Sequence, residues 1–193
     1  EGEVFFEQDR IGRNGKPFKL LKLATMLKDS PNLGSGTVTM KDDPRILPTG
    51  KFLRKTKLNE LPQLYNVLVG EMSLIGPRPL TLQAFEVYPP CTREAIKSVT
   101  PGLSGIGSII LRSEEDIMSG DKASLAFYNE SIMPYKGALE EWFVSNNTFF
   151  TYIKAILVTI FVVVFPGSSI GWFAFKGLPE PPDNLKKMLN YKN

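Results

Sequence analysis

The apolar run from Ala155 to Phe165 is the feature that most restricts how this chain can fold. The run is almost uninterrupted and stops at Pro166-Gly167. It is far shorter than the roughly 20 apolar residues that a membrane-spanning helix needs. A buried core helix and a helix lying in a membrane interface both remain open. Because aromatic residues and lysines flank the run, we expect residues 152–175 to form an apolar membrane-interface segment.

The first part of the chain carries a clear hairpin signal. Val4-Phe5-Phe6 predicts a strand, Asn14-Gly15 predicts a turn, and Phe18 to Leu23 predicts the returning strand. The chain has 193 residues, which suits one domain with an adequate core. We therefore expect a single domain over residues 1–193, with a compact, helix-rich α+β fold, short strands and amphipathic interfacial helices.

The strongest helix signal in the first half runs from Leu58 to Val69, where apolar residues recur at helical spacing and would share one face. Pro62 is tolerated in the first turn if Asn59 caps this helix, and Gly70 ends it. Further helices are expected over residues 49–57, 81–88, 92–99 and 123–131, and a strand over 108–111. Loops are expected over residues 30–48 and 100–107, and a rigid turn over 76–79.

The composition excludes several kinds of catalysis. The chain has no histidine and one cysteine, Cys91, which rules out Ser-His-Asp and Cys-His catalysis, His-ligated metals and an intrachain disulfide. Chemistry must use carboxylates, amides, hydroxyls, Lys, Arg or an oxygen-bound cation, for which Mg²⁺ is the natural candidate. The basic clusters at residues 51–57 and 186–192 can meet phosphates or anionic lipid headgroups, although a solvated surface is the ordinary explanation.

The segment from Lys51 to Pro79 holds residues that could bind a diphosphate. Asn59 and Glu60 lie at the predicted helix start, where free backbone N–H groups and the helix dipole favour anions. Arg54 precedes them and Arg78 follows on a stiff Pro-Arg-Pro turn, and guanidinium groups pair bidentately with phosphate. Glu60 could instead hold a divalent cation. The structural alternative makes Asn59 a cap, Glu60 a first-turn acid and both arginines surface residues.

Ordered motifs from residue 2 to about residue 160 resemble the bacterial sugar transferase family, the monotopic polyprenyl-phosphate phosphoglycosyl transferases. The motifs that carry the resemblance are GEVFFEQDRIG (2–12), KLATM (22–26), DPR (43–45), GKFLRKTKLNELPQL (50–64), GEMSLIGPRP (70–79) and PGLSG (101–105).

This resemblance implies a two-step transfer. In the family, an Asp beside a Glu attacks the β-phosphate of a UDP-sugar, UMP leaves, and polyprenyl (undecaprenyl) phosphate captures the phosphosugar from the enzyme. The Glu binds Mg²⁺, and a Lys and two Arg support the phosphates. Carried over, the catalytic positions are Glu60 and Asn59, the metal ligand is Glu60, and the phosphate-binding residues are Lys22, Arg54 and Arg78.

The resemblance also implies a cellular setting. The reaction would be the first step of surface polysaccharide or glycoconjugate synthesis, at the cytoplasmic face of the bacterial inner membrane and in contact with anionic lipids. Family members are monotopic, so a re-entrant membrane helix is expected before residue 1. Homo-oligomer formation is left open. No nucleic-acid partner is expected, because no recognisable nucleic-acid module surrounds the short basic cluster. The sugar and the pathway cannot be named from these motifs.

The chain departs from the family at the attacking residue, because Asn59 replaces Asp. An Asn caps a helix as well as an Asp does, but a neutral amide is a poor nucleophile. Three explanations remain open: an engineered inactivating substitution, a branch in which another carboxylate such as Glu60 attacks, or binding without turnover. Ala24 and Tyr152 also replace the usual Arg and Asp. The competing function is therefore a non-catalytic, membrane-associated homologue that binds nucleotide sugar or partners in polysaccharide assembly.

Overall fold

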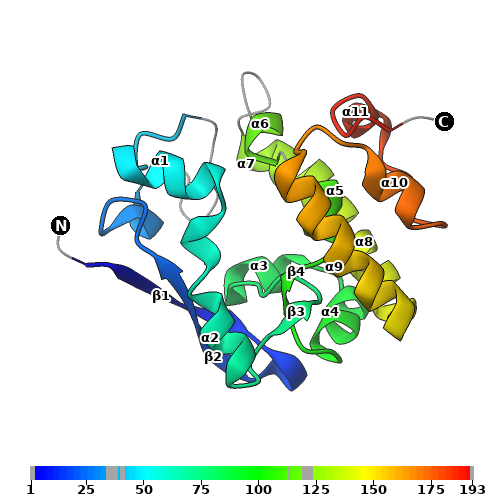
Figure 1. The fold of residues 1–193 in the computed structure, drawn as a ribbon, viewed down its shortest axis with the longest axis horizontal. Coiled ribbons are helices and arrows are strands. Elements are labelled where there is room, and N and C mark those ends of the chain that lie inside the picture. Colours follow the sequence, from blue (N-terminus) through cyan, green and yellow to red (C-terminus); the bar gives the residue numbers. More distant parts are fainter. Residues whose placement is uncertain (1–2, 34–38, 40–41, 113, 119–123, 192–193) are drawn as a thin grey trace.

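The structure is a computed structural model that describes residues 3–33, 39, 42–112, 114–118 and 124–191. A β-hairpin with short helices forms one side of the molecule, longer helices form the other, and a small parallel sheet lies between them (Figure 1). The chain begins at the hairpin and ends beside the longer helices (Figure 1). This arrangement confirms the helix-rich α+β fold class.

The hairpin pairs β1 (Phe5–Ile11) antiparallel with β2 (Pro17–Leu23). Asn14 and Gly15 form the turn with φ angles of 58° and 75°, a left-handed conformation that Asn and Gly tolerate best. The predicted hairpin is therefore confirmed. Its first strand is longer than Val4-Phe5-Phe6 alone indicates, because polar residues continue the pairing toward the turn.

Short helices and one strand follow the hairpin. They are η2 (Ser30–Asn32), α1 (Pro48–Lys55), η3 (Leu58–Glu60), α2 (Gln63–Leu68), β3 (Ser73–Ile75), α3 (Leu82–Val87) and α4 (Pro90–Lys97). The helices expected over 49–57, 81–88 and 92–99 are confirmed. Thr81 caps α3 by accepting a hydrogen bond from the backbone N–H of Ala84.

The second half is built from β4 (Gly102–Ser104), which pairs in parallel with β3, and from helices around the main core. These helices are α5 (Ile106–Ile110), α6 (Glu114–Ile117), α7 (Leu125–Phe127), the π-helical turn η5 (Tyr128–Ile132), α8 (Met133–Ser145), α9 (Phe149–Val164), α10 (Ile170–Ala174) and α11 (Asp183–Lys186). The most deeply buried core side chains include Ile106, Ile132, Leu139, Phe143 and Leu185.

The single helix predicted over residues 58–69 is divided in the structure. Lys57 adopts a left-handed conformation with φ of 60°, so a separate 3-10 turn, η3, starts after it. Pro62 occupies the cap position before α2 because it has no N–H to continue the preceding turn. The expected cap at Asn59 is therefore wrong: this residue lies inside η3, and its side chain is buried.

The strand predicted over residues 108–111 is also wrong, because these residues continue α5 and end it. Neighbouring isoleucines favour a strand locally, but here Ile106, Ile109 and Ile110 are buried together in the main core, which a helix allows. The predicted loop over 100–107 contains β4 and the start of α5. The helix predicted over 123–131 appears as α7 and η5, and Ala123 lies outside the described residues.

The apolar run forms most of α9, whose buried residues Ala155, Val158 and Val162 face the main core. The helix is 16 residues long and begins before the run, at Phe149. Among the described residues, we find no helix with the length and apolar character needed to cross a bilayer. In the predicted loop over 30–48, residues 34–38 and 40–41 lie outside the described residues.

Candidate active site

The tight path from α1 through η3 places Arg54, Asn59 and Glu60 beside β2, which carries Lys22. Arg54 lies in the last turn of α1, and the left-handed Lys57 turns the chain so that Asn59 points inward. The Asn59 side chain is 5% exposed, and its Oδ1 atom has no hydrogen-bond partner among the described residues. A buried amide oxygen without a partner is costly, which marks this position as a candidate ligand contact.

Glu60 forms an ion pair with Arg78, with 2.9 Å between Oε1 and Nη2. Arg78 arrives on the Pro-Arg-Pro turn that follows β3, so the pair joins two distant parts of the sequence. Burial alone raises the pKa of Glu60, but the charges of Arg78 and Lys22 outweigh it and hold this pKa well below its usual range. The charge of Glu60 in turn raises the pKa of Arg78. Glu60 is therefore ionised throughout the physiological range.

Lys22 lies among other cations. Burial, together with the charges of Arg78, Arg10 and Arg54, lowers the pKa of Lys22 to about 7, and the charge of Glu60 opposes this change. Burial and the charge of Arg78 also lower the pKa of Arg10, to about 10. A cluster with more cations than carboxylates attracts anions, and phosphate is the anion that Lys and Arg bind best.

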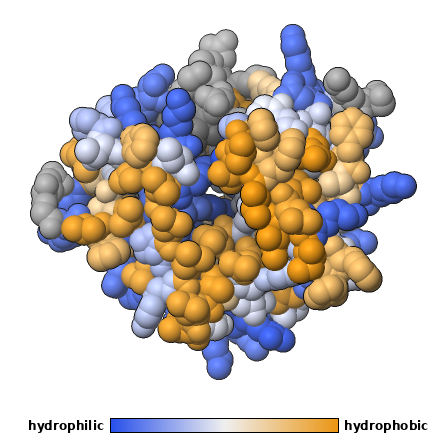
Figure 2. Space-filling model, viewed as in Figure 1, coloured by the Kyte–Doolittle hydropathy of each residue, from blue (hydrophilic) through white to orange (hydrophobic). Residues whose placement is uncertain are grey.

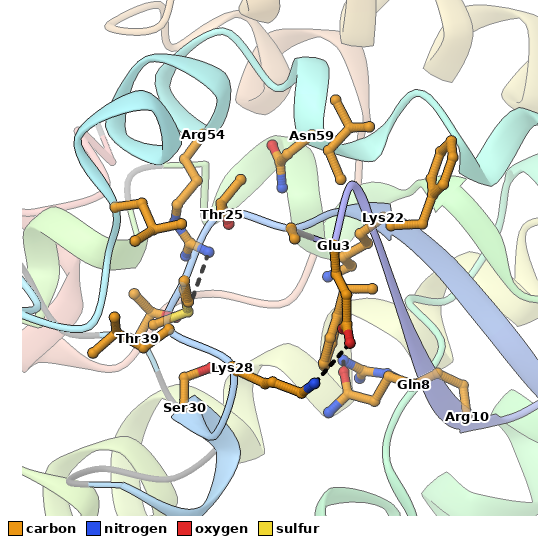
Figure 3. Close-up of a pocket in the computed structure, with 17 residues that line it drawn as sticks. Glu3, Gln8, Arg10, Lys22, Thr25, Lys28, Ser30, Thr39, Arg54 and Asn59 are labelled. Atoms are coloured by element: carbon orange, nitrogen blue, oxygen red, sulfur yellow. Dashed lines mark hydrogen bonds and ion pairs between the residues drawn. The ribbon is translucent and has the colours of Figure 1, made fainter. Parts of the chain in front are cut away.

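A pocket of about 160 Å³ opens beside this cluster, and its lining includes Lys22, Arg54, Asn59 and Arg10 (Figure 3). Arg54 also contacts the sulfur of Met26, with 3.9 Å between Nη1 and Sδ. Arg54 and Asn59 reach into the pocket from the same side in Figure 3. Glu60 and Arg78 do not line this pocket and pair at its edge. The structure thus brings the five predicted site residues to one region, with the ion pair beside the pocket.

Several charged residues near the site have no counterpart among the predicted ones. Arg10 on β1 donates from Nη1 to the carbonyl oxygen of Pro79 at 2.9 Å and so supports the Pro-Arg-Pro turn. Burial lowers the pKa of Arg112, and the charge of Glu60 opposes this effect, which places Arg112 near the same carboxylate. Arg10 lies in the FFEQDRIG motif, which is a usable signal, whereas Arg112 follows α5 with no local signal.

Behind Arg78 lies a second buried group of polar residues. Lys136 on α8 pairs with Glu114 at 2.6 Å, and its Nζ atom lies 5.9 Å from the centroid of the Tyr128 ring. Glu114 and Tyr128 both raise the pKa of Arg78. Tyr128 opens the π-helical turn η5, a rare conformation that often occurs at functional sites. Arg78 therefore connects the hairpin side of the molecule to the longer helices.

The site residues fit a magnesium ion that is shared with a phosphorylated ligand. Mg²⁺ commonly uses one or two carboxylates together with substrate phosphates. Glu60 supplies one carboxylate, and Asn59 Oδ1 supplies a neutral oxygen without a partner among the described residues. We find no group of three or more His, Cys, Asp or Glu residues in the described ranges that could hold a metal alone. Any cation here would therefore depend on oxygens from the ligand.

Comparison with known proteins decides the family. The sequence profile described as "Bacterial sugar transferase" matches residues 1–166. The chain belongs to the bacterial sugar transferase family. This result confirms the resemblance and the sugar-transferase class predicted from the sequence, for a match that extends from the hairpin to the end of α9.

Individual relatives in this family carry more specific names. The UDP-glucose:undecaprenyl-phosphate glucose-1-phosphate transferase of Escherichia coli is 36% identical over 163 residues, covering 81% of this chain and 33% of the relative. The undecaprenyl-phosphate galactose phosphotransferase of Salmonella typhimurium is 31% identical over 178 residues, covering 84% and 34%. The uncharacterized sugar transferase EpsL of Bacillus subtilis is 35% identical over 158 residues, covering 81% and 68%. The chain thus spans about a third of the first two relatives and about two thirds of EpsL.

Proposed function

We propose that this member of the bacterial sugar transferase family transfers a sugar 1-phosphate from a UDP-sugar to undecaprenyl phosphate and releases UMP. The observation that carries the proposal is the ionised carboxylate of Glu60 beside a cluster of Lys and Arg at a pocket. The names of the Escherichia coli and Salmonella relatives support the same reaction class. The sugar itself stays unassigned.

The donor's diphosphate binds to the basic residues that line the pocket and to Arg78 beside it. Lys22, Arg54 and Arg78 neutralise its negative charges, and Arg10 holds the turn that carries Arg78. Phosphoryl transfer depends largely on positioning and on stabilisation of charge, and buried cations provide both. When bound, Mg²⁺ would be held by Glu60 and Asn59 and would neutralise further charge on the phosphates.

Glu60 is the carboxylate on which we place the covalent step. A lone pair of its carboxylate attacks the β-phosphorus, and the bond from that phosphorus to the bridging oxygen breaks with its electron pair leaving on UMP. An oxygen of undecaprenyl phosphate then attacks the same phosphorus, and the bond to Glu60 breaks, which restores the carboxylate. Dividing one difficult displacement into two lowers the barrier of each. Arg78 orients the carboxylate through the 2.9 Å contact to Oε1.

Two exposed apolar faces would contact the membrane and so hold the site close to its lipid acceptor. From the residue after η3 through α2, side chains with large exposed fractions include Leu61 (52%), Tyr65 (59%) and Leu68 (85%). On α9, Phe150, Leu157 and Val164 are also exposed. Figure 2 shows apolar areas over both segments with a polar hollow between them. Exposed apolar surface of this extent is typical of a membrane or protein contact, so we place these faces on the cytoplasmic surface of the inner membrane.

The direct test measures UMP. The full-length protein in nanodiscs that contain undecaprenyl phosphate is incubated with Mg²⁺ and a panel of UDP-sugars, and we expect UMP release with at least one of them. Intact mass after incubation without acceptor should show a phosphosugar adduct that maps to Glu60. Absence of UMP across a broad panel, with a folded protein, would contradict the transferase activity.

A non-catalytic binder is the second candidate, and Asn59 is the observation that favours it. The family uses two carboxylates for attack and for metal binding, whereas η3 offers Glu60 alone. A protein whose Glu60 remains committed to the metal would bind nucleotide sugar without turnover. UDP-sugar binding without UMP release, together with activity gained by Asn59→Asp, would identify this function. Turnover by the native chain would reject it.

A further inference from the structure

Glu140 on α8 is a buried carboxyl group that the proposed reaction does not use. Its side chain is 3% exposed, and within the described residues neither carboxylate oxygen completes a hydrogen bond. The neighbouring Glu141 accepts a hydrogen bond from Thr92. A buried acceptor without a partner lowers stability, and native structures retain few of them. Such a group is a candidate for a functional role.

The Glu140 carboxyl group packs against Gly105 and Gly107, a glycine segment that lies beside the Pro-Arg-Pro turn. A Cβ atom at Gly107 would lie 2.5 Å from Glu140 Oε1. A Cβ atom at Gly105 would lie 2.2 Å from the carbonyl oxygen of Gly76 and 3.7 Å from Glu140 Oε2. These distances leave no room for a side chain at either glycine. The carboxyl group, the glycine segment and the turn are therefore packed in direct succession.

The same turn carries Arg78 toward Glu60. Its backbone is held by hydrogen bonds from Gly76 N to Ser104 O and from Gly102 N to Pro77 O, each 2.9 Å long. The backbone N–H of Arg78 faces the Glu140 carboxyl group, whereas its guanidinium pairs with Glu60. A change at Glu140 therefore acts on the backbone from which the Arg78 guanidinium extends.

We propose that Glu140 is a positioning residue for Arg78, holding the Gly76–Arg78 turn from behind and setting how much of the guanidinium charge is available to a substrate phosphate. This inference rests on the proposed function, in which Arg78 binds phosphate. Glu140 does not touch the phosphate itself and acts through the turn.

The charges around Glu140 give the inference a pH signature. Burial raises the pKa of Glu140 to about 7, against the opposing effects of Arg78 and Lys136. Tyr88, which also faces Glu140, has a pKa raised well above its usual value and stays neutral. Lys136 remains charged because its pairing with Glu114 outweighs burial and raises its pKa. Glu140 thus gains a negative charge near neutral pH and then competes with phosphate for the charge of Arg78.

The first experiment needs no ligand and follows the Arg78 backbone amide by ¹H–¹⁵N NMR from pH 5.5 to 8.5. We expect this resonance to titrate with a midpoint near pH 7 in the wild-type protein, to titrate with a clearly smaller amplitude in Glu140→Gln, where Lys22 still titrates near that pH, and to keep its full amplitude in the control Glu141→Gln. A flat Arg78 resonance in the wild type, or an unchanged titration in Glu140→Gln, overturns the proposal whether or not the protein binds UDP.

The second experiment measures UDP affinity calorimetrically at pH 6 and pH 8. At each pH, the UDP affinity of the variant is divided by that of the wild type. This ratio cancels the titrations of Lys22 and of the nucleotide, because they occur in both proteins. We expect Glu140→Gln to match the wild type at pH 6 and to bind about fivefold more tightly at pH 8, with no such change in Glu141→Gln. A pH-independent ratio for Glu140→Gln overturns the proposal. Failure of the wild type to bind UDP rejects the proposed function instead. In that case the NMR titration of the Arg78 amide alone tests whether Glu140 contacts the Arg78 turn.

Discussion

Asn66 on α2 and Glu140 on α8 are both buried and polar, yet their surroundings differ. Asn66 donates from Nδ2 to the Lys19 carbonyl oxygen and to Glu71, each at 2.8 Å, and accepts from the Leu21 N–H at 3.1 Å. Glu140 has no side-chain partner among the residues that the structure describes, and the backbone N–H of Arg78 faces its carboxyl group without completing a well-formed hydrogen bond. Satisfied buried groups hold a fold together, whereas unsatisfied ones lower stability and persist where function requires them. Hydrogen-bond satisfaction of a buried polar side chain therefore helps to distinguish residues that stabilise the fold, such as Asn66, from residues that support the site, such as Glu140.

The largest effect is expected at Glu60, a site residue whose carboxylate is satisfied by Arg78 and is also the group on which we place the covalent step. Glu60→Gln keeps the shape but removes both the attacking carboxylate and the charge that pairs with Arg78, so we expect UMP release to fall by at least about 10³-fold, or about 4 kcal/mol. Steady-state assays of UMP measure this loss. Glu7→Gln, at an exposed position of β1, is the matched control and should keep near wild-type rates. Equal losses in both variants would indicate a general defect.

Next in size is the expected loss of stability at Asn66. Asn66→Ala leaves the Lys19 carbonyl oxygen and the Leu21 N–H without the partners that they have now, so the free energy of unfolding should fall by about 3 kcal/mol. Urea denaturation measures this change. Asn59→Ala is the contrasting variant, because its Oδ1 atom has no partner to lose among the described residues, and it should cost less than about 1 kcal/mol. Similar losses of unfolding free energy in the two variants would show that hydrogen-bonded Asn66 and unpartnered Asn59 do not differ in their contribution to stability.

The pH dependence of stability sharpens the comparison at Glu140. Its pKa rises from an ordinary 4.5 to about 7 on folding, so the folded state binds more protons and stability falls as pH rises through this range. Glu140→Gln removes this titration. The stability of the variant relative to the wild type should therefore increase by about 2 kcal/mol between pH 5 and pH 8. Urea titrations at several pH values measure it, and a constant difference would show that Glu140 stays in one charge state.

The smallest effect on the fold is expected on the outer face of the helix that carries Asn66. Leu68 is 85% exposed, so Leu68→Lys should change the free energy of unfolding by no more than about 0.5 kcal/mol. Binding to vesicles of neutral lipid should nevertheless weaken about tenfold, because an apolar contact with the acyl region is lost. Vesicle co-sedimentation measures this. Val87→Lys on α3 is the control, and equal weakening there would argue against α2 as the membrane-facing surface.

Local signals in the sequence predict those parts of the fold that depend on neighbours in the chain. Asn14-Gly15 specifies the hairpin turn, and the Thr81 cap marks the start of α3. Helical spacing groups Leu61 with Leu68, and both are exposed in the structure, but spacing alone cannot tell whether such residues point into the core or outward. The structure buries Gln63 and Asn66 instead.

The rest of the site depends on contacts between distant segments. The family motifs point to Glu60, Arg54 and Arg78, but the pairing of Glu60 with Arg78 requires the turn after β3 to fold back on η3. The left-handed Lys57, after which η3 begins, has no recognisable local signal because Lys rarely adopts this conformation. Glu140 lies on a helix whose charged residues resemble an ordinary solvated face until the core is assembled around them.

The order of these segments along the chain affects when the site forms during synthesis. Glu60 and Arg78 leave the ribosome before α8, which backs the Arg78 turn. A nascent chain therefore carries its basic and acidic side chains before the support that orients them exists. Under the proposed function, nucleotide binding would begin only after α8 has been made, so a truncated translation product that lacks α8 should not sequester UDP-sugars.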